Sequence, residues 1–117
     1  MISYSEDTIV AISTPPGEGG IAVVRISGKS SKVIGDMIFQ GKIRPSEASS
    51  HTVHFGKIID PSSLDFVDEV LLTVMWAPNS YTAENVIEIS SHGGPLVAKK
   101  ILDLCLKFGA RHALPGE

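Results

Sequence analysis

The stretch 14-TPPGEGGIAVVRISG-28 joins a turn rich in proline and glycine to an apolar segment that contains one arginine. Residues 20–27 are rich in Val and Ile, which predicts a β-strand that begins after the turn. Side chains alternate between the two faces of a strand, so Val24 and Ile26 share one face and Arg25 lies on the other. We therefore expect Val24 and Ile26 in the core and Arg25 on the opposite side of the sheet.

Further strands are predicted from β-branched segments that end at turn residues. They cover residues 7–13, 52–59, 67–76 and 85–90, with a short last strand at 110–113. The turn at Asp60-Pro61-Ser62 indicates that the two strands on either side of it pair antiparallel. The polar segment 40–50 is predicted to be a connecting loop.

Two helices are predicted from apolar residues at one-turn spacing. The first covers 30–39, although its interior Gly35 weakens the pattern, and its apolar residues are Val33, Ile34, Met37 and Ile38. The second begins near Pro95 and ends before Gly109, with an apolar stripe of Leu96, Ile101, Leu104, Cys105 and Phe108. Together these elements predict an α+β fold, in which a mostly antiparallel or mixed sheet packs with two helices.

The composition is that of one ordinary folded domain, residues 1–117, with 43% hydrophobic and 20% charged residues. A net charge of -3 argues against a free-standing nucleic-acid binder, so RNA or DNA would be met by a local patch or through a partner. No segment resembles a signal peptide or is long and apolar enough to span a membrane, so we expect no membrane association. The single cysteine, Cys105, excludes an internal disulfide and favours a reducing, cytoplasmic location.

Gly28-Lys29-Ser30 resembles the end of a phosphate-binding P-loop, because it follows one predicted strand and precedes a helix. That motif requires a second glycine where Val23 stands. The glycines of 17-GEGG-20 are followed by a strand and therefore lack the helix N-terminus that binds phosphates in dinucleotide folds. We interpret both segments as turns and expect no GTP binding by them.

Two further segments carry polar residues that could form a site. Glu88 interrupts an apolar strand, so its carboxylate either meets a buried donor or points to water, and the pattern leaves both alternatives open. Glu84 precedes this strand in a polar loop and is expected to be solvated. His92-Gly93-Gly94 stands at the start of the second helix, where free amides can hold an anion, although a turn that needs glycine is the simpler explanation. Cys105 is expected to be a small buried hydrophobe.

Three segments together resemble one known family. They are 7-DTIVAISTPPGEGGIAVVRISG-28, 78-PNSYTAENVIEISSHGGP-95 and 110-ARHALPGE-117, and they are similar in the same order to the N-terminal domain of the tRNA-modification GTPase family MnmE (TrmE). Residues 40–66 carry no such signature. The resemblance implies a fold similar to the folate-binding domain of the glycine-cleavage aminomethyltransferases, a homodimer, and a reduced folate such as 5-formyl- or 5,10-methylene-tetrahydrofolate as the cofactor.

The resemblance also implies a larger protein with helical, GTPase and C-terminal catalytic parts. In the family, the GTPase part binds GTP, potassium and magnesium, so we expect none of these ligands on residues 1–117. The whole protein acts with the FAD-containing partner MnmG (GidA) on the wobble uridine of tRNA, where it helps to install a carboxymethylaminomethyl group. Cys105 does not match the catalytic cysteine of the family and inherits no role from it.

Two folate contacts of the family map onto Arg25 and Glu88, and a third, a lysine, maps beyond Glu117. His92, Gly93 and Gly94 are further candidates to line the site. A carboxylate can accept the two adjacent donors of a pterin ring, and a guanidinium suits the acceptors and carboxylates of a folate.

This sequence also departs from the family at three positions. The family commonly has arginine, glycine and aspartate where Glu18, Ala83 and Asn85 stand, which puts the loop geometry and the loop charge in question. We expect a reduced-folate-binding and dimerisation domain. A purely structural dimerisation module and a stand-alone folate-dependent one-carbon transferase remain as alternatives.

Overall fold

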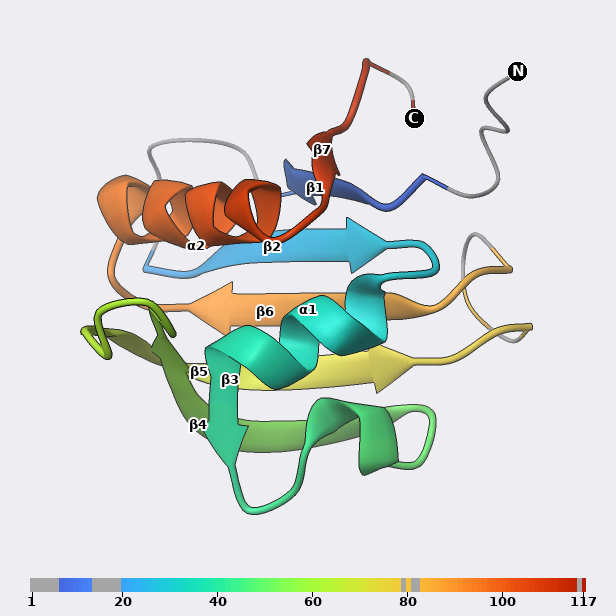
Figure 1. Ribbon diagram of the computed structural model, residues 1–117, viewed down its shortest axis with the longest axis horizontal. Helices are drawn as coiled ribbons and strands as arrows, with labels where there is room; N and C mark the ends of the chain where they lie inside the picture. The colour runs from blue at the N-terminus through green and yellow to red at the C-terminus, as the bar shows by residue number, and fades with distance from the viewer. Residues whose placement is uncertain (1–6, 14–19, 79, 81–82, 116) are drawn as a thin grey trace.

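A seven-stranded sheet with the order β3-β4-β5-β6-β2-β1-β7 organises the molecule in the computed structural model, which describes residues 7–13, 20–78, 80, 83–115 and 117. Neighbouring strands pair antiparallel except β1 and β7, which pair parallel. Figure 1 shows the helices α1 and α2 in front of this sheet. The predicted α+β fold, a mixed sheet packed with two helices, is confirmed.

The elements follow the predicted order along the chain. They are β1 (Ile9–Ile12), β2 (Ala22–Ser27), α1 (Ser31–Ile38), β3 (Phe39–Gly41), the short 3-10 helix η2 (Pro45–Glu47), β4 (Thr52–Ile59), β5 (Phe66–Met75), β6 (Val86–Ser91), α2 (Pro95–Lys107) and β7 (Arg111–His112). As predicted from the turn at Asp60-Pro61-Ser62, β4 and β5 form an antiparallel pair. Residues 14–19, which include the proline-rich turn and Glu18, lie outside the described part of the chain.

The predicted loop at 40–50 is only partly a loop, because β3 extends into it and η2 lies within it. Long-range contacts stabilise this segment: Trp76 Nε1 donates to the Ala48 carbonyl at 2.8 Å, and Ser46 N donates to Asp36 Oδ1 at 2.9 Å. Three-residue elements held by such contacts leave no periodic signal in the sequence. The prediction from local composition was therefore wrong there.

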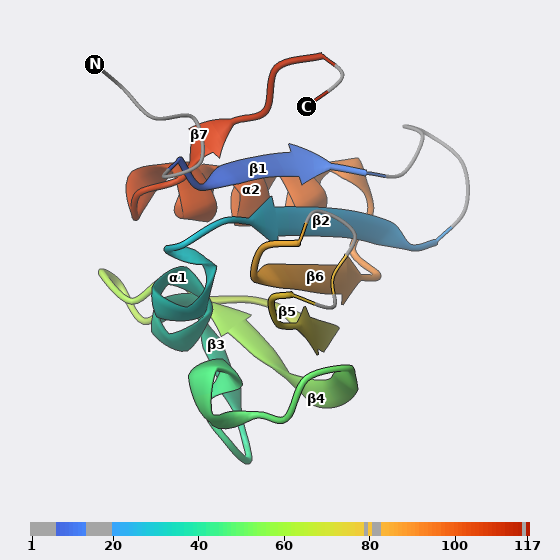
Figure 2. The same cartoon turned by 90° about the vertical axis from the view of Figure 1, so that its right-hand side faces the viewer.

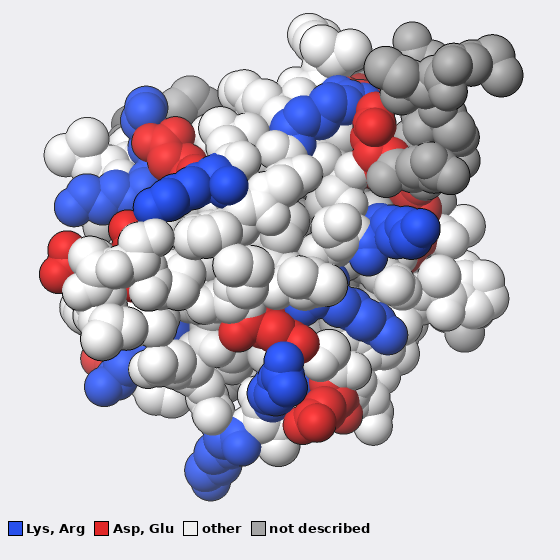
Figure 3. Space-filling view, in the orientation of Figure 1, with Lys and Arg blue, Asp and Glu red and all other residues white. Residues whose placement is uncertain are grey.

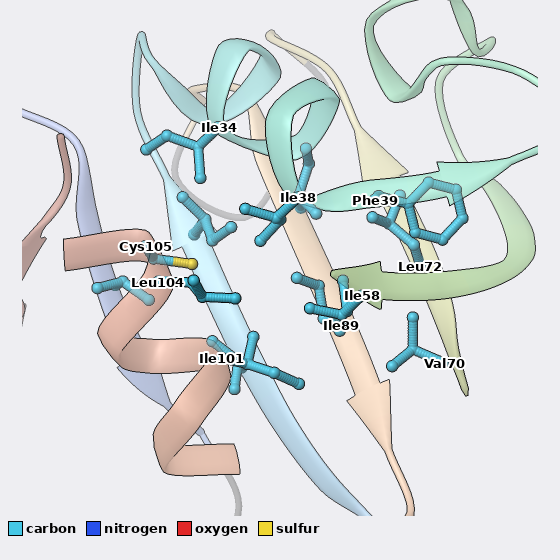
Figure 4. Close-up of a cluster of buried hydrophobic side chains, with 14 of the residues drawn as sticks. Ile34, Ile38, Phe39, Ile58, Val70, Leu72, Ile89, Ile101, Leu104 and Cys105 are labelled. Atoms are coloured by element: carbon cyan, nitrogen blue, oxygen red, sulfur yellow. The ribbon is translucent and has the colours of Figure 1, made fainter. Parts of the chain in front are cut away.

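One face of the sheet forms the core, together with both helices. Its fully buried residues include Val24, Ile26, Leu72, Ile87 and Ile89 from the strands, and Ile34, Ile38, Ile101 and Cys105 from the helices. Figure 4 shows the side chains of α1 and α2 meeting over the central strands. Val24 and Ile26 therefore face the core as predicted, and neither helix covers the opposite face, which we call the open face.

The buried faces of the helices differ in detail from the predicted stripes. In α1, Ile34 and Ile38 are buried, whereas Val33 and Met37 are exposed. The reason is Gly35, which is also buried: a Cβ added there would lie 2.7 Å from Ile87 Cδ1, so the glycine lets the helix approach the sheet.

The stripe predicted for α2 also changes. Leu96 in the first turn is exposed, whereas Ala98 and Leu102 are buried. Ile101, Leu104 and Cys105 are buried as predicted. The part of the apolar stripe that follows the first turn therefore contacts the core.

Candidate ligand site

Arg25 and Glu88 lie side by side on the open face. They are direct cross-strand partners, Arg25 on β2 and Glu88 on β6. Arg25 Nε donates to Glu88 Oε2 at 2.7 Å, and Arg25 Nη2 lies 2.5 Å from the same oxygen. The two side chains are 40% and 20% exposed, respectively. The arginine thus points away from the core as predicted, and of the two alternatives for Glu88 the structure shows an open-face carboxylate that also meets a donor.

The pair has a neighbouring strand on each side. The pairing register continues from Arg25 to Ala11 on β1, and from Glu88 to Thr73 on β5. Arg25 Nε and Nη2 both contact Glu88 Oε2, and Oε1 accepts no hydrogen bond from any residue within the described ranges. A carboxylate oxygen on a half-open surface, next to a fixed cation, is suited to accept a hydrogen bond from a ligand.

Stability alone gives little reason for a charged pair at this position. A cross-strand pair contributes about 0.2–1 kcal/mol whether it is ionic or apolar, and exposed ion pairs fall in the same range. Two β-branched residues would stabilise the sheet as well and would leave no charge to be solvated. The pair therefore contributes little to the stability of the fold.

Glu84 lies near the Arg25–Glu88 pair. It was predicted to be solvated, and this prediction was wrong. It is half-buried, and its Oε2 accepts a hydrogen bond from Ser27 Oγ at 3.1 Å. Ser27 lies two residues from Arg25 on the same face of β2, which corresponds to about 7 Å. The loop before β6 folds back over the end of β2, and Glu84 meets a residue 57 positions away in the sequence, a contact that local pattern cannot reveal.

The same loop accommodates the two departures from the family pattern that lie in the described residues. Ala83 has a φ of 59°, the left-handed conformation that glycine adopts without strain. Asn85 Oδ1 accepts a hydrogen bond from Ala77 N at 2.9 Å, and an aspartate offers the same kind of oxygen. Ala83 therefore costs some stability, while Asn85 retains the acceptor.

His92, Gly93 and Gly94 are not brought to the Arg25–Glu88 pair within this chain. His92 is exposed and follows the end of β6, four residues after Glu88, which corresponds to about 13 Å in an extended chain. Its backbone N–H donates to Asp68 Oδ2 at 3.0 Å. Gly94 has a φ of 84°, so the turn into α2 itself requires glycine there.

The turn at Gly28-Lys29-Ser30 uses its amides within the protein. Gly28 N donates to the Asn85 carbonyl at 2.9 Å, and Ser30 N donates to Thr8 Oγ1 at 2.7 Å. A P-loop needs such amides free to surround phosphate. This arrangement supports the interpretation of the segment as a turn.

Cys105 is fully buried in the core between α2 and the sheet. Burial raises the pKa of its thiol to about 12, because the thiolate would lose its hydration. The side chain packs as a small hydrophobe, as predicted.

The described residues hold neither a metal-binding cluster nor a membrane-spanning helix. No group of three or more His, Cys, Asp and Glu side chains in this part of the chain could hold a metal ion. No helix in it has the length and apolar character needed to cross a membrane.

Comparison with known proteins places the sequence in one family. Residues 8–117 match the model of the family described as GTP-binding protein TrmE N-terminus. The chain belongs to this family. It is 52% identical over 111 residues to the tRNA modification GTPase MnmE of Levilactobacillus brevis and 51% identical over 114 residues to that of Acetivibrio thermocellus.

These alignments cover 95% and 97% of the chain but only 24% and 25% of the two relatives. The MnmE protein of Lactiplantibacillus plantarum is 53% identical over 111 residues, with 95% of the chain and 24% of the relative covered. The chain thus spans about a quarter of the length of these curated relatives and corresponds to an N-terminal domain of MnmE.

Proposed function

We propose that this domain binds a reduced folate at the Arg25–Glu88 pair and associates with a second copy of itself, as part of a tRNA-modification GTPase. The supporting observation is the charged pair at the centre of an open sheet face, where stability alone does not require charge. In the whole protein, the bound one-carbon unit would serve the modification of the wobble uridine of tRNA in the cytoplasm, together with the FAD-containing partner.

The folate would bind through complementary charges and donors. The ring N–H and exocyclic amine of the pterin can donate side by side to the Glu88 carboxylate, whose Oε1 accepts no hydrogen bond from the described residues. Arg25 would hold Glu88 in place and bring a positive charge next to the ligand. The folate supplies the one-carbon unit, and these side chains bind and orient it.

Calorimetric titration of the 117-residue chain with 5-formyl-tetrahydrofolate tests this proposal. Glu88→Gln keeps the size of the side chain but places a donor opposite a pterin donor, so we expect about tenfold to a hundredfold weaker binding. Glu84→Gln is the matched control, since it keeps an oxygen that can accept from Ser27. Equal affinity of the wild type and Glu88→Gln, with both proteins folded by circular dichroism, would refute the site.

Association with a second copy is a separate measurement. Neither α1 nor α2 covers the open face, and the sheet ends in the short strands β3 and β7, so a second copy has surface to cover. We expect sedimentation equilibrium to show a dimer whose population rises with protein concentration. A monomer at all concentrations, with folate bound normally, would remove dimerisation from the proposal and retain the folate site.

A further inference from the structure

A hollow of about 760 Å³ lies on the outer strands β3 and β4, away from the Arg25–Glu88 pair. Its lining includes Gln40, Lys42, Val53, His54, Phe55 and Lys57. Phe55 is 63% exposed, and its cross-strand partner Leu71 on β5 is exposed as well. An exposed phenylalanine on a regular strand leaves an aromatic face open to a ligand.

Two glycines of β3 and β4 are among the residues that line this hollow. Gly41 and Gly56 are paired across β3 and β4. A Cβ at Gly56 would lie 2.5 Å from the Gln40 carbonyl oxygen, and one at Gly41 would lie 3.1 Å from the Phe55 carbonyl oxygen. A Cβ at either glycine would also clash with the ring of Phe39, which is buried in the core. Phe55 precedes Gly56 along β4, so its side chain lies on the opposite, exposed face of the strand.

The charge of the hollow is positive. Its lining contains two lysines and a histidine but no carboxylate. Lys42 and Lys57 form no ion pair with any residue in the described ranges, whereas Arg44 pairs with Asp36 and Lys99 with Asp103. Glu69 stands opposite Lys57 in the register of β5 but does not line the hollow.

The face that carries the helices has no broad basic surface. Figure 3 shows Lys and Arg interspersed with Asp and Glu over the face that carries the helices. A second hollow, of about 530 Å³, continues around the β3 edge, where its lining contains Lys42 and Arg44 together with Glu47. The cations around β3 and β4 are therefore a local patch, the kind that a chain of net charge -3 needs for contact with a polyanion.

We propose that this β3–β4 patch, formed by Lys42, Phe55 and Lys57, binds single-stranded RNA. An unpaired base would stack on the ring of Phe55, and the flanking phosphates would lie near the two lysine ammonium groups. Proteins usually bind single-stranded nucleic acid through exposed aromatic rings that stack on the bases and nearby cations that contact the phosphates. The inference rests on the proposed role in tRNA modification and is independent of the folate site.

A second exposed phenylalanine provides a matched control. Phe66 on β5 is 57% exposed, close to the value for Phe55, but its hollow is lined by Asp60, Asp65 and Asp103 as well as by lysines. Carboxylates repel phosphate, so we expect no RNA at Phe66. Lys100, which lines that hollow and has no ion pair among the described residues, is the control for the two lysines of the patch.

The test is fluorescence anisotropy of the 117-residue chain with a labelled RNA hairpin that has an unpaired loop. We expect Phe55→Ala to weaken binding about tenfold or more, and Phe66→Ala to leave it within about twofold. Lys42→Gln and Lys57→Gln should each lower the slope of log K against log salt by about 0.7, whereas Lys100→Gln should leave the slope unchanged. A fully paired RNA of the same composition should bind more weakly, because its bases are not free to stack.

Three results would overturn the proposal. They are the absence of wild-type binding, equal binding by Phe55→Ala and wild type, and equal binding of paired and unpaired RNA. If Phe55→Ala abolishes dimerisation in sedimentation but leaves RNA affinity unchanged, a second copy occupies this surface and the proposal is wrong. If Glu88→Gln loses folate binding but keeps its RNA affinity, the two ligands bind at separate sites. The same variant therefore tests the two proposals separately.

Discussion

Ala83 has a backbone conformation that L-residues other than Asn and Asp seldom adopt, with φ at 59°. Replacement by glycine removes the Cβ clash, so we expect Ala83→Gly to raise the free energy of unfolding by about 0.5–1 kcal/mol. Urea denaturation measures this change. Ala113→Gly, where φ is not positive, is the control and should lower stability. A loss of stability in Ala83→Gly similar to the control would contradict the strain at this position.

The Cys105 thiol has no access to solvent, and burial raises its pKa to about 12. Because the thiolate is the reactive form, we expect the native protein at pH 8 to resist an aromatic disulfide reagent and the denatured protein to react rapidly. Absorbance of the released thiolate measures both rates. Rapid reaction of the native protein would show that α2 opens from the core.

At the residue scale, the sequence predicted which face of the sheet Arg25 lies on, but it did not predict which residues it contacts. Strand alternation assigned Arg25 to the face opposite Val24, because a period of two needs only local sequence. The contact between Arg25 and Glu88 joins residues 63 positions apart and depends on register, which local pattern does not specify. The contact of Glu84 with Ser27 was missed for the same reason.

Helix α1 approaches the sheet through Gly35, whose missing Cβ leaves space for the end of Ile87. Alanine favours a helix by about 1 kcal/mol over glycine. We nevertheless expect Gly35→Ala to lower the free energy of unfolding by about 1–2 kcal/mol, because the added methyl would lie 2.7 Å from Ile87 Cδ1 in a filled core. Chemical denaturation of the variant measures the change.

Ile87→Val removes the methyl group that Gly35→Ala would meet. Alone, Ile87→Val should lower the free energy of unfolding by about 0.5–1.5 kcal/mol. The loss in the double variant should be about 1 kcal/mol smaller than the sum of the losses in the two single variants. Additive effects of the two substitutions would show that the helix shifts away without contact.

At the element scale, long sequence patterns predicted the helices and strands well. They did not predict where a helix packs closely on the sheet. The bounds of β4 and the extent of α2 were predicted well, because alternation and capping residues are local signals. In α1 the periodicity was correct, but the buried face included a glycine, and so Val33 and Met37 were wrongly expected in the core. Only the packed sheet decides which side of a short helix is buried.

At the scale of the whole molecule, Arg111 links the two ends of the described chain. Its guanidinium binds Asp7 at 3.0 Å and also pairs with Glu117, while Leu114 N donates to Glu117 Oε1 at 2.6 Å. Figure 2 shows β7 beside β1, at the edge of the sheet where these ends meet. The pair between Asp7 and Arg111 joins residues 104 positions apart and was not predictable from composition.

The hydrogen bonds from Arg111 and from Leu114 N–H lower the pKa of the Glu117 carboxyl from 4.5 to about 2. Its folded pKa lies below the unfolded value, so its stabilisation is present above pH 4.5 and is lost as the pH falls toward 2. We expect the difference in Tm between wild type and Glu117→Gln to shrink over this interval. Thermal unfolding at several pH values measures it, and a difference that stays constant with pH would contradict the linkage.

The order of elements and the mixed sheet with two helices followed from the sequence, because each element has its own local signal. The strand order could not be predicted in this way, because strands far apart in the sequence, such as β2 and β6, pair side by side in the sheet. The candidate site is formed by residues of these two paired strands. Its two residues were expected from resemblance to a family, and their direct contact is a result of the register.

The most direct test of the account is to locate the folate on the sheet. Backbone amide chemical shifts of the isotope-labelled chain, titrated with 5-formyl-tetrahydrofolate, report the binding position even when affinity is low. We predict saturating shift changes around Arg25 on β2, Glu88 on β6 and Thr73 on β5, and none in the exposed turns of α1. Changes confined to other parts of the molecule, or no change at millimolar folate, would contradict the claim that the Arg25–Glu88 pair is the folate site.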